Sequence, residues 1–551
     1  MTTKFLSTCF LLFAFVAVSD ATAQSTTHAF LQKSVNKYAL DAAQIPAAAF
    51  KNYLMEDDWT HWDKGPVKNL KVAAKTTRGA IWLKSEHGAA RFDPTAKHLW
   101  DRWHYFAGQA WLPDDHVTDI YVDPEHASES VWIKTKTGVS RITFYVSTLA
   151  EKERHYDNLT ETYHVRKGFV ARSVLTTPGD ITSATNSDTD NDGLWTTMHI
   201  AAQAYRYAAT GDEDARTKAR RGLHALMRLE TIDPIPGFYA RTYRTFDEPL
   251  PHKDNGEWHP VGDGKTEWKG DTSSDETVGH YYGYSLYYDL VADEAEKDSI
   301  RSYIRLITDY MIDNDYELLD IDGKPTRWGR WSEEYYDSLE GDYEKALRSL
   351  ELLAFLKTAY HITGDEKYQT AYMDRVDKGY AQFTLEYRRW GSEESEINFS
   401  DDELYFLSVY PLLKYEDNPA LRAIYMDGLR YTWTQVQPES NALWNYISAA
   451  LGAGPLTEPL KEDALRALER SPNNLIRWSV TNSHRIDVRL IQSPDRHGRG
   501  FLTRALAPDE RPLHKHNGNP YQADGGNGGR EMMEPTHWLL PYWMGRYYGW
   551  L

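Results

Sequence analysis

The segment WKGDTSSDETVGHYYGYSLYY, residues 268–288, carries the densest group of side chains that could transfer protons. Asp275 and Glu276 are typical of the first turn of a helix. His280 follows about one turn later, with Tyr281 beside it, and His and Tyr are suited to removing a proton from the carbon next to a carboxylate. We therefore predict His280 and Tyr281 as catalytic and Asp275 and Glu276 as substrate-binding. The competing interpretation is that His280 is a hydrogen-bonded core residue.

Two further segments place arginine where it could hold a sugar acid. DGKPTRWGRW, residues 322–331, is a turn, and VTNSHRIDVR, residues 480–489, is a predicted loop. An arginine grips a carboxylate or sulfate through two hydrogen bonds, and a tryptophan can stack on the sugar ring. Arg–Trp stacking on the surface is the alternative for the first segment. We predict catalytic roles for Arg327, His484 and Arg485, and substrate binding by Trp328, Arg330 and Asn482.

The acidic loop SDTDNDGLW, residues 187–195, begins like a calcium-binding EF-hand loop. Such a loop needs a bidentate Glu at its twelfth position, which is His199 when counted from Asp188. A helix follows Gly193, so the acidic residues also suit its N-terminus. A structural cation stays open as an alternative. We predict a substrate-binding rim formed by Asp190, Asp192 and Trp195.

Two other polar segments could reach a substrate. INFSDDELYFL, residues 397–407, reads as a helix start in which Asp401 and Asp402 are either glycosidase carboxylates or capping residues. HKHNGNPYQADGGNGG, residues 514–529, is a long Gly/Asn loop, and such loops are usually functional or mobile. It lacks the spacing of a zinc-binding helix, so we expect no metal and no cofactor. The predicted substrate-binding residues here are Asn398, Asn517 and Asn519.

The elements that must position these residues are mainly helical. From about residue 190 the apolar residues recur with helical periodicity. The pattern Tyr-x-x-Thr-Gly-Asp-Glu occurs at 207–213 and again at 360–366, where Gly ends one helix and Asp caps the next. Repeated helical hairpins predict an α/α toroid over residues 176–551, with a cleft built by the loops at one end.

Residues 24–175 read as a small β region. VKNLKVAAKTTRGAIWLKSEHGAARF (67–92) aligns with VTDIYVDPEHASESVWIKTKTGVSRI (117–142), and both copies alternate apolar and polar residues around a turn. The unit resembles the two-component-regulator type of propeller repeat. Two blades cannot close a ring, because propellers need about four or more. We predict a scaffold that leans on the rest of the chain or on a second subunit.

Composition limits the functions that remain. The net charge of −19 argues against nucleic acid as a partner, because phosphate binding needs clustered cations. Residues 1–23 read as a secretory signal peptide, and no later stretch is long and apolar enough to insert in a membrane. The only cysteine, Cys9, lies in that signal. We therefore expect an exported, periplasmic protein; an oligomer stays open.

The motifs DNDGLW, GDTSSDE, PTRWG, SDDEL, NGNPY and LLPYWMGRY resemble a family of exported bacterial proteins that occur with polysaccharide-degrading enzymes. Among characterised types, the chain resembles the ulvan-oligosaccharide dehydratases, and it also resembles α/α-toroid polysaccharide lyases more broadly. The resemblance implies an acidic oligosaccharide substrate and elimination across C4–C5 of a uronic acid, which leaves a 4,5-unsaturated sugar. It transfers no individual site residue.

The elimination chemistry needs a neutraliser for the carboxylate, a base for H5 and an acid for the leaving group, and only stabilisation of the transition state speeds the step. The same residue types serve a lyase and a dehydratase. Two alternatives stay open: a glycoside hydrolase that uses paired carboxylates on the same toroid, and a glycan-binding or sensor protein.

Overall fold

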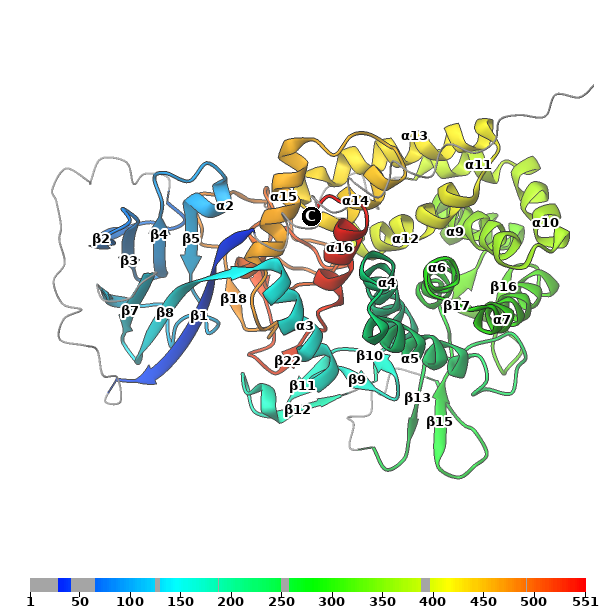
Figure 1. Cartoon of the computed structure of the whole chain (residues 1–551), viewed down its shortest axis with the longest axis horizontal. Helices are drawn as coiled ribbons and strands as arrows, with labels where there is room; N and C mark the ends of the chain where they lie inside the picture. Colours follow the sequence, from blue (N-terminus) through cyan, green and yellow to red (C-terminus); the bar gives the residue numbers. More distant parts are fainter. Residues whose placement is uncertain are drawn as a thin grey trace, which may run out of the picture.

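The structure is a computed structural model of the chain, and it describes residues 28–40, 65–123, 129–186, 188–248, 257–387, 397–491 and 493–551. The predicted signal peptide lies outside these residues. A β region and a helical ring lie side by side, with the connection between the last two long helices placed between them (Figure 1).

Two four-stranded antiparallel sheets form the β region. Each sequence repeat supplies three consecutive strands of one sheet, and a further strand completes its edge. The first sheet has the order β2-β3-β4-β5, and the second has the order β1-β8-β7-β6. The strands are β1 (Ala29–Ala39), β2 (Lys71–Lys75), β3 (Ile81–Ser85), β4 (Gly88–Phe92), β5 (Trp103–Phe106), β6 (Val117–Val122), β7 (Glu129–Thr135) and β8 (Gly138–Thr148).

The apolar faces of both sheets share one core, which includes Phe106 of the first sheet and Phe144 of the second. Glu129 of β7 is buried in this core, where it accepts two hydrogen bonds of 2.9 Å from Arg91 and one of 2.7 Å from the Trp82 indole. A buried carboxylate needs such partners to offset its desolvation. The repeats therefore form two packed sheets, and the propeller part of the expectation is not confirmed.

Among the described residues, six inner helices form a ring in which each helix packs against the next and α16 packs against α4. Outer helices pack on their outside, and α3 closes against α16. The helices thus form the α/α toroid that the periodicity predicts. The inner helices are α4 (Asp192–Thr210), α6 (Ser274–Leu290), α9 (Leu339–Thr363), α12 (Phe399–Tyr415), α14 (Ala442–Ala450) and α16 (Thr536–Tyr547). The outer helices are α3 (Leu149–Tyr163), α5 (Glu213–Leu229), α7 (Glu294–Asp313), α10 (Glu366–Asp377), α13 (Pro419–Val436) and α15 (Glu458–Arg470).

The repeated Thr-Gly-Asp-Glu pattern joins an inner to an outer helix in both places, as predicted. Gly211 and Gly364 end α4 and α9 in the left-handed region, at φ 71° and 72°, which glycine adopts at no steric cost. Asp212 then caps α5 through its side chain. The α3 helix is a difference from expectation, because it lies inside the range predicted to be β.

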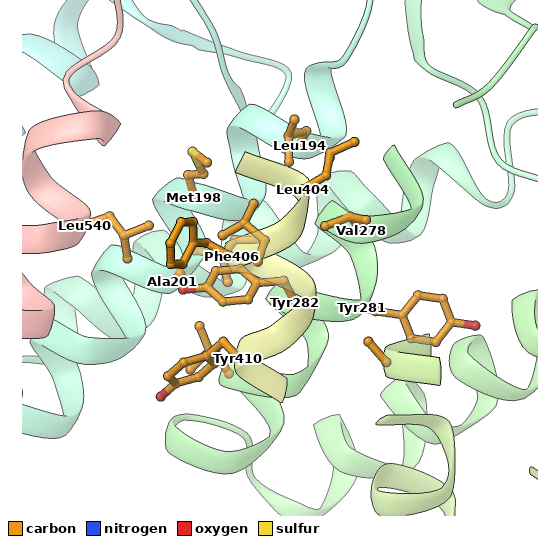
Figure 2. Packing of buried hydrophobic residues seen from close by; sticks show 14 of the residues in the cluster. Leu194, Met198, Ala201, Val278, Tyr281, Tyr282, Leu404, Phe406, Tyr410 and Leu540 are labelled. Carbon is orange, nitrogen blue, oxygen red and sulfur yellow. The ribbon is translucent and has the colours of Figure 1, made fainter. Parts of the chain in front are cut away.

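Aromatic and aliphatic side chains from neighbouring inner helices fill the ring. Figure 2 shows Met198 of α4, Tyr282 of α6 and Phe406 of α12 packed together, while Tyr281 points away from them. Below its mouth, the axis of the toroid is therefore a packed core. No described helix is both long and apolar enough to span a bilayer.

Short elements decorate the ring and shape its surroundings. Two hairpin-like sheets stand at the N-terminal ends of inner helices: β13-β15-β14 before α6, and β16-β17 before α9. The remaining elements are α2 (Leu99–Arg102), β9 (Val165–Arg166), β10 (Phe169–Val170), β11 (Ser173–Leu175), β12 (Ala184–Asn186), β13 (Thr242–Thr245), β14 (Trp258–Pro260), β15 (Thr266–Lys269), β16 (Glu317–Leu319), β17 (Pro325–Arg330), α8 (Glu333–Tyr336), α11 (Tyr380–Phe383), β18 (Val480–Thr481), β19 (Leu490–Ile491), β20 (Phe501–Leu502), β21 (Asp524–Gly525) and β22 (Glu531–Met532).

Residues 471–535, the connection from α15 to α16, hold the β region against the ring. Buried charges join the two parts: Arg470 binds Asp509 at 2.7 Å and Glu510 at 3.2 Å, and Lys33 of β1 also binds Asp509. Arg485 binds Glu510 at 2.6 Å. We call Lys33, Arg470, Arg485, Asp509 and Glu510 the junction network.

Candidate active site

A cleft with a volume of about 800 Å³ opens at the mouth of the toroid. The N-terminal ends of α4, α6, α9 and α12 meet there, so the cleft is bounded by residues next to each helix start. Its wall combines acidic, cationic and aromatic side chains, which suits a sugar's hydroxyl rim and apolar faces. The lining includes Asp190, Arg241, Asp275, Trp328, Tyr343, Arg348, Tyr387, Asn398, Asp401 and His497.

The structure brings together four residues that the sequence analysis named for substrate binding. Asp190, Asp275, Trp328 and Asn398 all line this cleft, although they lie up to two hundred residues apart in the chain. Asp190 also forms an ion pair with Lys269 of β15, which fixes the acidic loop over the mouth.

A smaller pocket of about 170 Å³ adjoins the cleft, and Asp190 and Asn191 line both. We call it the end pocket. Trp195, predicted from sequence, lies in it with Lys515 and Glu534. The Lys515 ammonium lies 3.1 Å from the centroid of the Trp195 ring, and it has no hydrogen bond or ion pair with any described residue.

Asp275, Glu403, Lys515 and Glu534 form the acid cluster. Burial raises the pKa of Glu403 to about 8; Asp275 and Glu534 raise it further, and Lys515 opposes them. Burial also raises the pKa of Glu534, against the attraction of Lys515. Within the described part of the chain, both carboxyl oxygens of Glu403 and one of the two of Glu534 are buried without a hydrogen-bond donor. The cluster therefore holds one carboxyl group, that of Glu403, whose pKa lies above neutral pH, and a second, that of Glu534, whose pKa is raised.

The motif Asp192-Gly193 places α4 directly against α6. A Cβ at Gly193 would collide with the carboxyl group of Glu276, so glycine is required by this close approach. Burial raises the pKa of Glu276 well above its usual range, with Asp192 adding to the effect and Arg241 opposing it. Glu276 is fully buried and does not line the cleft, which corrects the expectation that it binds substrate.

The second corrected residue of this motif is Asp192. Its carboxylate is fully buried and binds Arg166 at 2.7 Å and the hydroxyls of Thr189 and Thr242 at 2.7 and 2.5 Å. These bonds satisfy the carboxylate internally, so it fixes the loop and is not exposed to substrate. They also leave the loop poorly suited to calcium, and no group of three metal-binding side chains occurs among the residues described.

His280 and Tyr281 do not reach the cleft. The His280 ring bonds the Glu276 backbone carbonyl at 2.7 Å, lies tilted against the Tyr239 ring with 4.7 Å between centroids, and is fully buried. Burial lowers its pKa to about 4. Tyr281 points to the outer helix α7, where its hydroxyl lies 2.6 Å from Thr308. These contacts favour the interpretation of His280 as a core residue over the catalytic one. The first residues of α6 line the cleft, but one helical turn further on the side chains lie inside the packed ring.

Neither Arg327, predicted as catalytic, nor Arg330, predicted to bind substrate, lines the cleft. Arg327 is exposed on β17, and its backbone N–H donates to Asp271 at 2.9 Å, while only its neighbour Trp328 lines the cleft. Arg330 points to the other side of the strand and binds Glu317 at 3.1 Å. Successive residues of a strand face opposite sides, which separates the Arg327 side chain from Trp328 and the cleft. Arg330 is instead held away from the cleft lining by its ion pair with Glu317.

The loop around His484 faces the β region. The His484 ring lies 2.8 Å from the Tyr105 hydroxyl and stacks on His87, and Arg485 belongs to the junction network. Asn482 donates 2.9 Å to the backbone carbonyl of Glu510. His484 and Arg485 therefore contact Tyr105 of the β region, Asn482 bonds within the connection, and none of the three lines the cleft.

The polar loop after His514 contributes differently from the prediction. Asn519 bonds Asp495 at 3.3 Å and does not line the cleft or the end pocket, and neither does Asn517. Their neighbour Lys515 does. The sequence analysis missed Lys515, Glu403 and Glu534. Lys515 and Glu403 lie in segments that it had singled out, and Glu534 lies just before the start of α16; these positions were the only available signals.

Comparisons with known proteins show no family for this chain. No protein-family model and no curated protein matches it. Among solved structures, it is similar to a single mutant thermostable endoglucanase from Alicyclobacillus acidocaldarius, with 11% identity, 88% of this chain and 99% of that chain covered, and a TM-score of 0.42. It is also similar to a metagenome-derived glycoside hydrolase family 9 endoglucanase (12%, 95% and 96%, 0.40) and to a sugar epimerase from a ruminal bacterium (9%, 72% and 98%, 0.40). Likenesses at this level carry no argument about function.

Proposed function

We propose that the chain is a carbohydrate-active enzyme that hydrolyses glycosidic bonds at the toroid mouth. The observation that carries this proposal is the acid cluster, in which buried carboxyl groups with raised pKa values lie next to the cleft. Glycosidases need one carboxyl group that donates a proton to the leaving oxygen and a second that acts as base or nucleophile.

Glu534 is the proton donor in this proposal, because it lines the end pocket and burial raises its pKa. Asp275 is the second carboxyl group, because it lines the larger cleft. A sugar chain that spans both cavities across Asp190 would meet one group on each side. Glu403 acts as a positioning residue, since the negative charges of Asp275 and Glu534 both raise its pKa.

Aromatic and amide side chains of the cleft would hold the sugar units. Trp328, Tyr343 and Tyr387 offer rings, and Asn398 offers an amide. The cleft volume of about 800 Å³ lies in the upper part of the range of about 300–1,000 Å³ that is typical of ligand sites. A volume of this size suits an oligosaccharide more than a single sugar.

Elimination from a uronic acid is the second candidate. The observation that favours it is the Lys515 ammonium, which has no ion pair with a described residue and could neutralise a sugar carboxylate. In that reaction the substrate would be acidic, and the product would be unsaturated.

One incubation separates the candidates. The protein is mixed with neutral and uronic-acid oligosaccharides, and both new reducing ends and ultraviolet absorbance of an unsaturated product are followed. Hydrolysis predicts new reducing ends without absorbance, whereas elimination predicts absorbance. Binding without either change would contradict both and support a glycan-binding protein.

A further inference from the structure

A second cavity, of about 190 Å³, lies at the junction of the β region with residues 471–535. It is distinct from the toroid mouth and shares none of the cleft's lining residues. One wall comes from strand β1 and the other from the connection, so a molecule bound there would touch both parts of the chain.

The charged groups around this cavity are already satisfied. Asp509 binds Arg470 and Lys33, and Glu510 binds Arg470 and Arg485. Arg511, the remaining cation of the wall, donates 2.6 Å to the Leu506 backbone carbonyl. A charged ligand would have to compete with these ion pairs in a buried site, where separating a pair is costly.

Neutral polar groups of the same wall remain available. The side-chain N–H₂ of Gln32, a residue only 3% exposed, has no acceptor among the described residues. An unpaired buried donor costs about 1–3 kcal/mol, so a ligand that accepts a hydrogen bond from Gln32 is favoured. The indoles of Trp111 and Trp478 and the exposed amide of Asn474 also line the cavity and offer further donors.

We propose that this junction cavity binds a neutral polyhydroxy molecule of about one sugar unit. Its volume is below the ~300 Å³ at which pockets for larger ligands begin, which excludes an oligosaccharide. Hydroxyl oxygens accept from the amide and indole groups, and their lack of charge leaves the junction network intact. The bound sugar would stabilise the contact between the β region and the toroid.

Saturation-transfer NMR on the full chain tests this site without reference to turnover, so its result is independent of the proposed hydrolysis. The probes are D-glucose, D-xylose and L-rhamnose, with D-glucuronate as the charged counterpart. Gln32→Ala and Asn474→Ala remove hydrogen-bonding groups, and Ala110→Phe fills the cavity; Asn474 is exposed, so its variant should fold. Trp328→Ala is the matched control at the cleft.

We expect transfer to at least one neutral sugar, with binding about tenfold weaker in Gln32→Ala and Asn474→Ala and absent in Ala110→Phe, as expected for lost hydrogen bonds. Trp328→Ala should keep this binding. Absence of transfer from all three neutral sugars overturns the proposal. So does binding that Trp328→Ala removes, that all junction variants retain, or that only glucuronate shows.

Discussion

The acid cluster and the junction network both bury carboxyl groups, yet their protons behave in opposite ways. In the junction network, burial alone would raise the pKa of Asp509, but Arg470 and Lys33 overcome it and hold the pKa at about 2. In the acid cluster, burial raises the pKa of Glu403 to about 8, and Lys515 does not overcome it. Both carboxyl groups are buried and lose their hydration. Their pKa values differ because Asp509 is in direct contact with two cations and Glu403 with none among the described residues.

This contrast indicates that the buried carboxylates of the junction network stabilise the fold, whereas the carboxyl groups of the acid cluster are available for chemistry. A buried pair in good geometry holds its parts together, and breaking it leaves an uncompensated charge. A buried carboxyl group without a partner keeps a proton that it can donate, which is how functional sites shift pKa values. The two regions therefore predict different responses to the same kind of substitution.

Breaking the junction network should have the largest effect on stability. Arg485→Ala removes the shorter ion pair of both Glu510 and Asp487, leaving them only Arg470 and Arg504 at 3.2 Å, and we expect a loss of about 3–5 kcal/mol in the free energy of unfolding. Arg330→Ala is the matched control, because its pair with Glu317 is partly exposed and is expected to contribute only about 0–1 kcal/mol. Denaturant melts of both variants measure the difference. Equal losses of unfolding free energy would show that the buried junction network contributes no more than a partly exposed ion pair.

Substitutions in the ring core should cost less and leave turnover intact. His280→Ala should lose about 1–3 kcal/mol, and Tyr281→Phe about 1–2 kcal/mol because the buried bond between the Tyr281 and Thr308 hydroxyls is lost, although Thr308 keeps its bond to the Ile304 carbonyl. Turnover per folded molecule should stay within about threefold, or roughly 0.65 kcal/mol of barrier. A drop of a hundredfold at either residue with an intact melting temperature would restore the catalytic interpretation.

The pH dependence of stability should differ between the two regions. Glu403 has a folded pKa raised to about 8, so its contribution to stability falls as pH rises from its unfolded value towards 8. Glu403→Gln should flatten the decline of melting temperature over that range. Asp509 has a folded pKa lowered to about 2, so its contribution is lost as pH falls towards 2, and Asp509→Asn should flatten the acid side instead. If melting temperature depended on pH in the same way in both variants, the proposed difference between the acid cluster and the junction network would be contradicted.

The smallest effect is expected from metal removal. Arg166, Thr189 and Thr242 already satisfy the carboxylate of Asp192, and Lys269 binds Asp190. Chelator treatment should therefore leave melting temperature and activity unchanged. A large loss that calcium alone restores would place a cation in the acidic loop.

Much of the fold followed from periodicity and caps. The repeated Thr-Gly-Asp-Glu pattern fixed two helical hairpins, and the aligned repeats gave the two sheets of the β region. Both signals are local, because they depend on backbone conformation and on alternation within a few residues. The helix α3 was missed because its position in the chain placed it with the strands that precede it.

The site was predicted less well, because it depends on which way a helix face turns. Asp275 lines the cleft, whereas Glu276 and His280 on the same helix are buried within the ring. Arg327 and Trp328 are adjacent, and only the tryptophan faces the cleft. Lys515 and Glu534 lie on an irregular connection, where no period exists to predict orientation.

The most direct test of the account is to measure kcat and melting temperature on the same preparations of Glu534→Gln and Asp275→Asn. The substrate is whichever oligosaccharide shows turnover with the unaltered protein. Removing a proton-transfer group typically lowers the rate by about 10² to 10⁴, so we expect a loss of this size in both variants with melting temperatures unchanged or higher. Near-normal kcat in both variants would contradict the claim that the unpaired carboxyl groups of the acid cluster perform the chemistry.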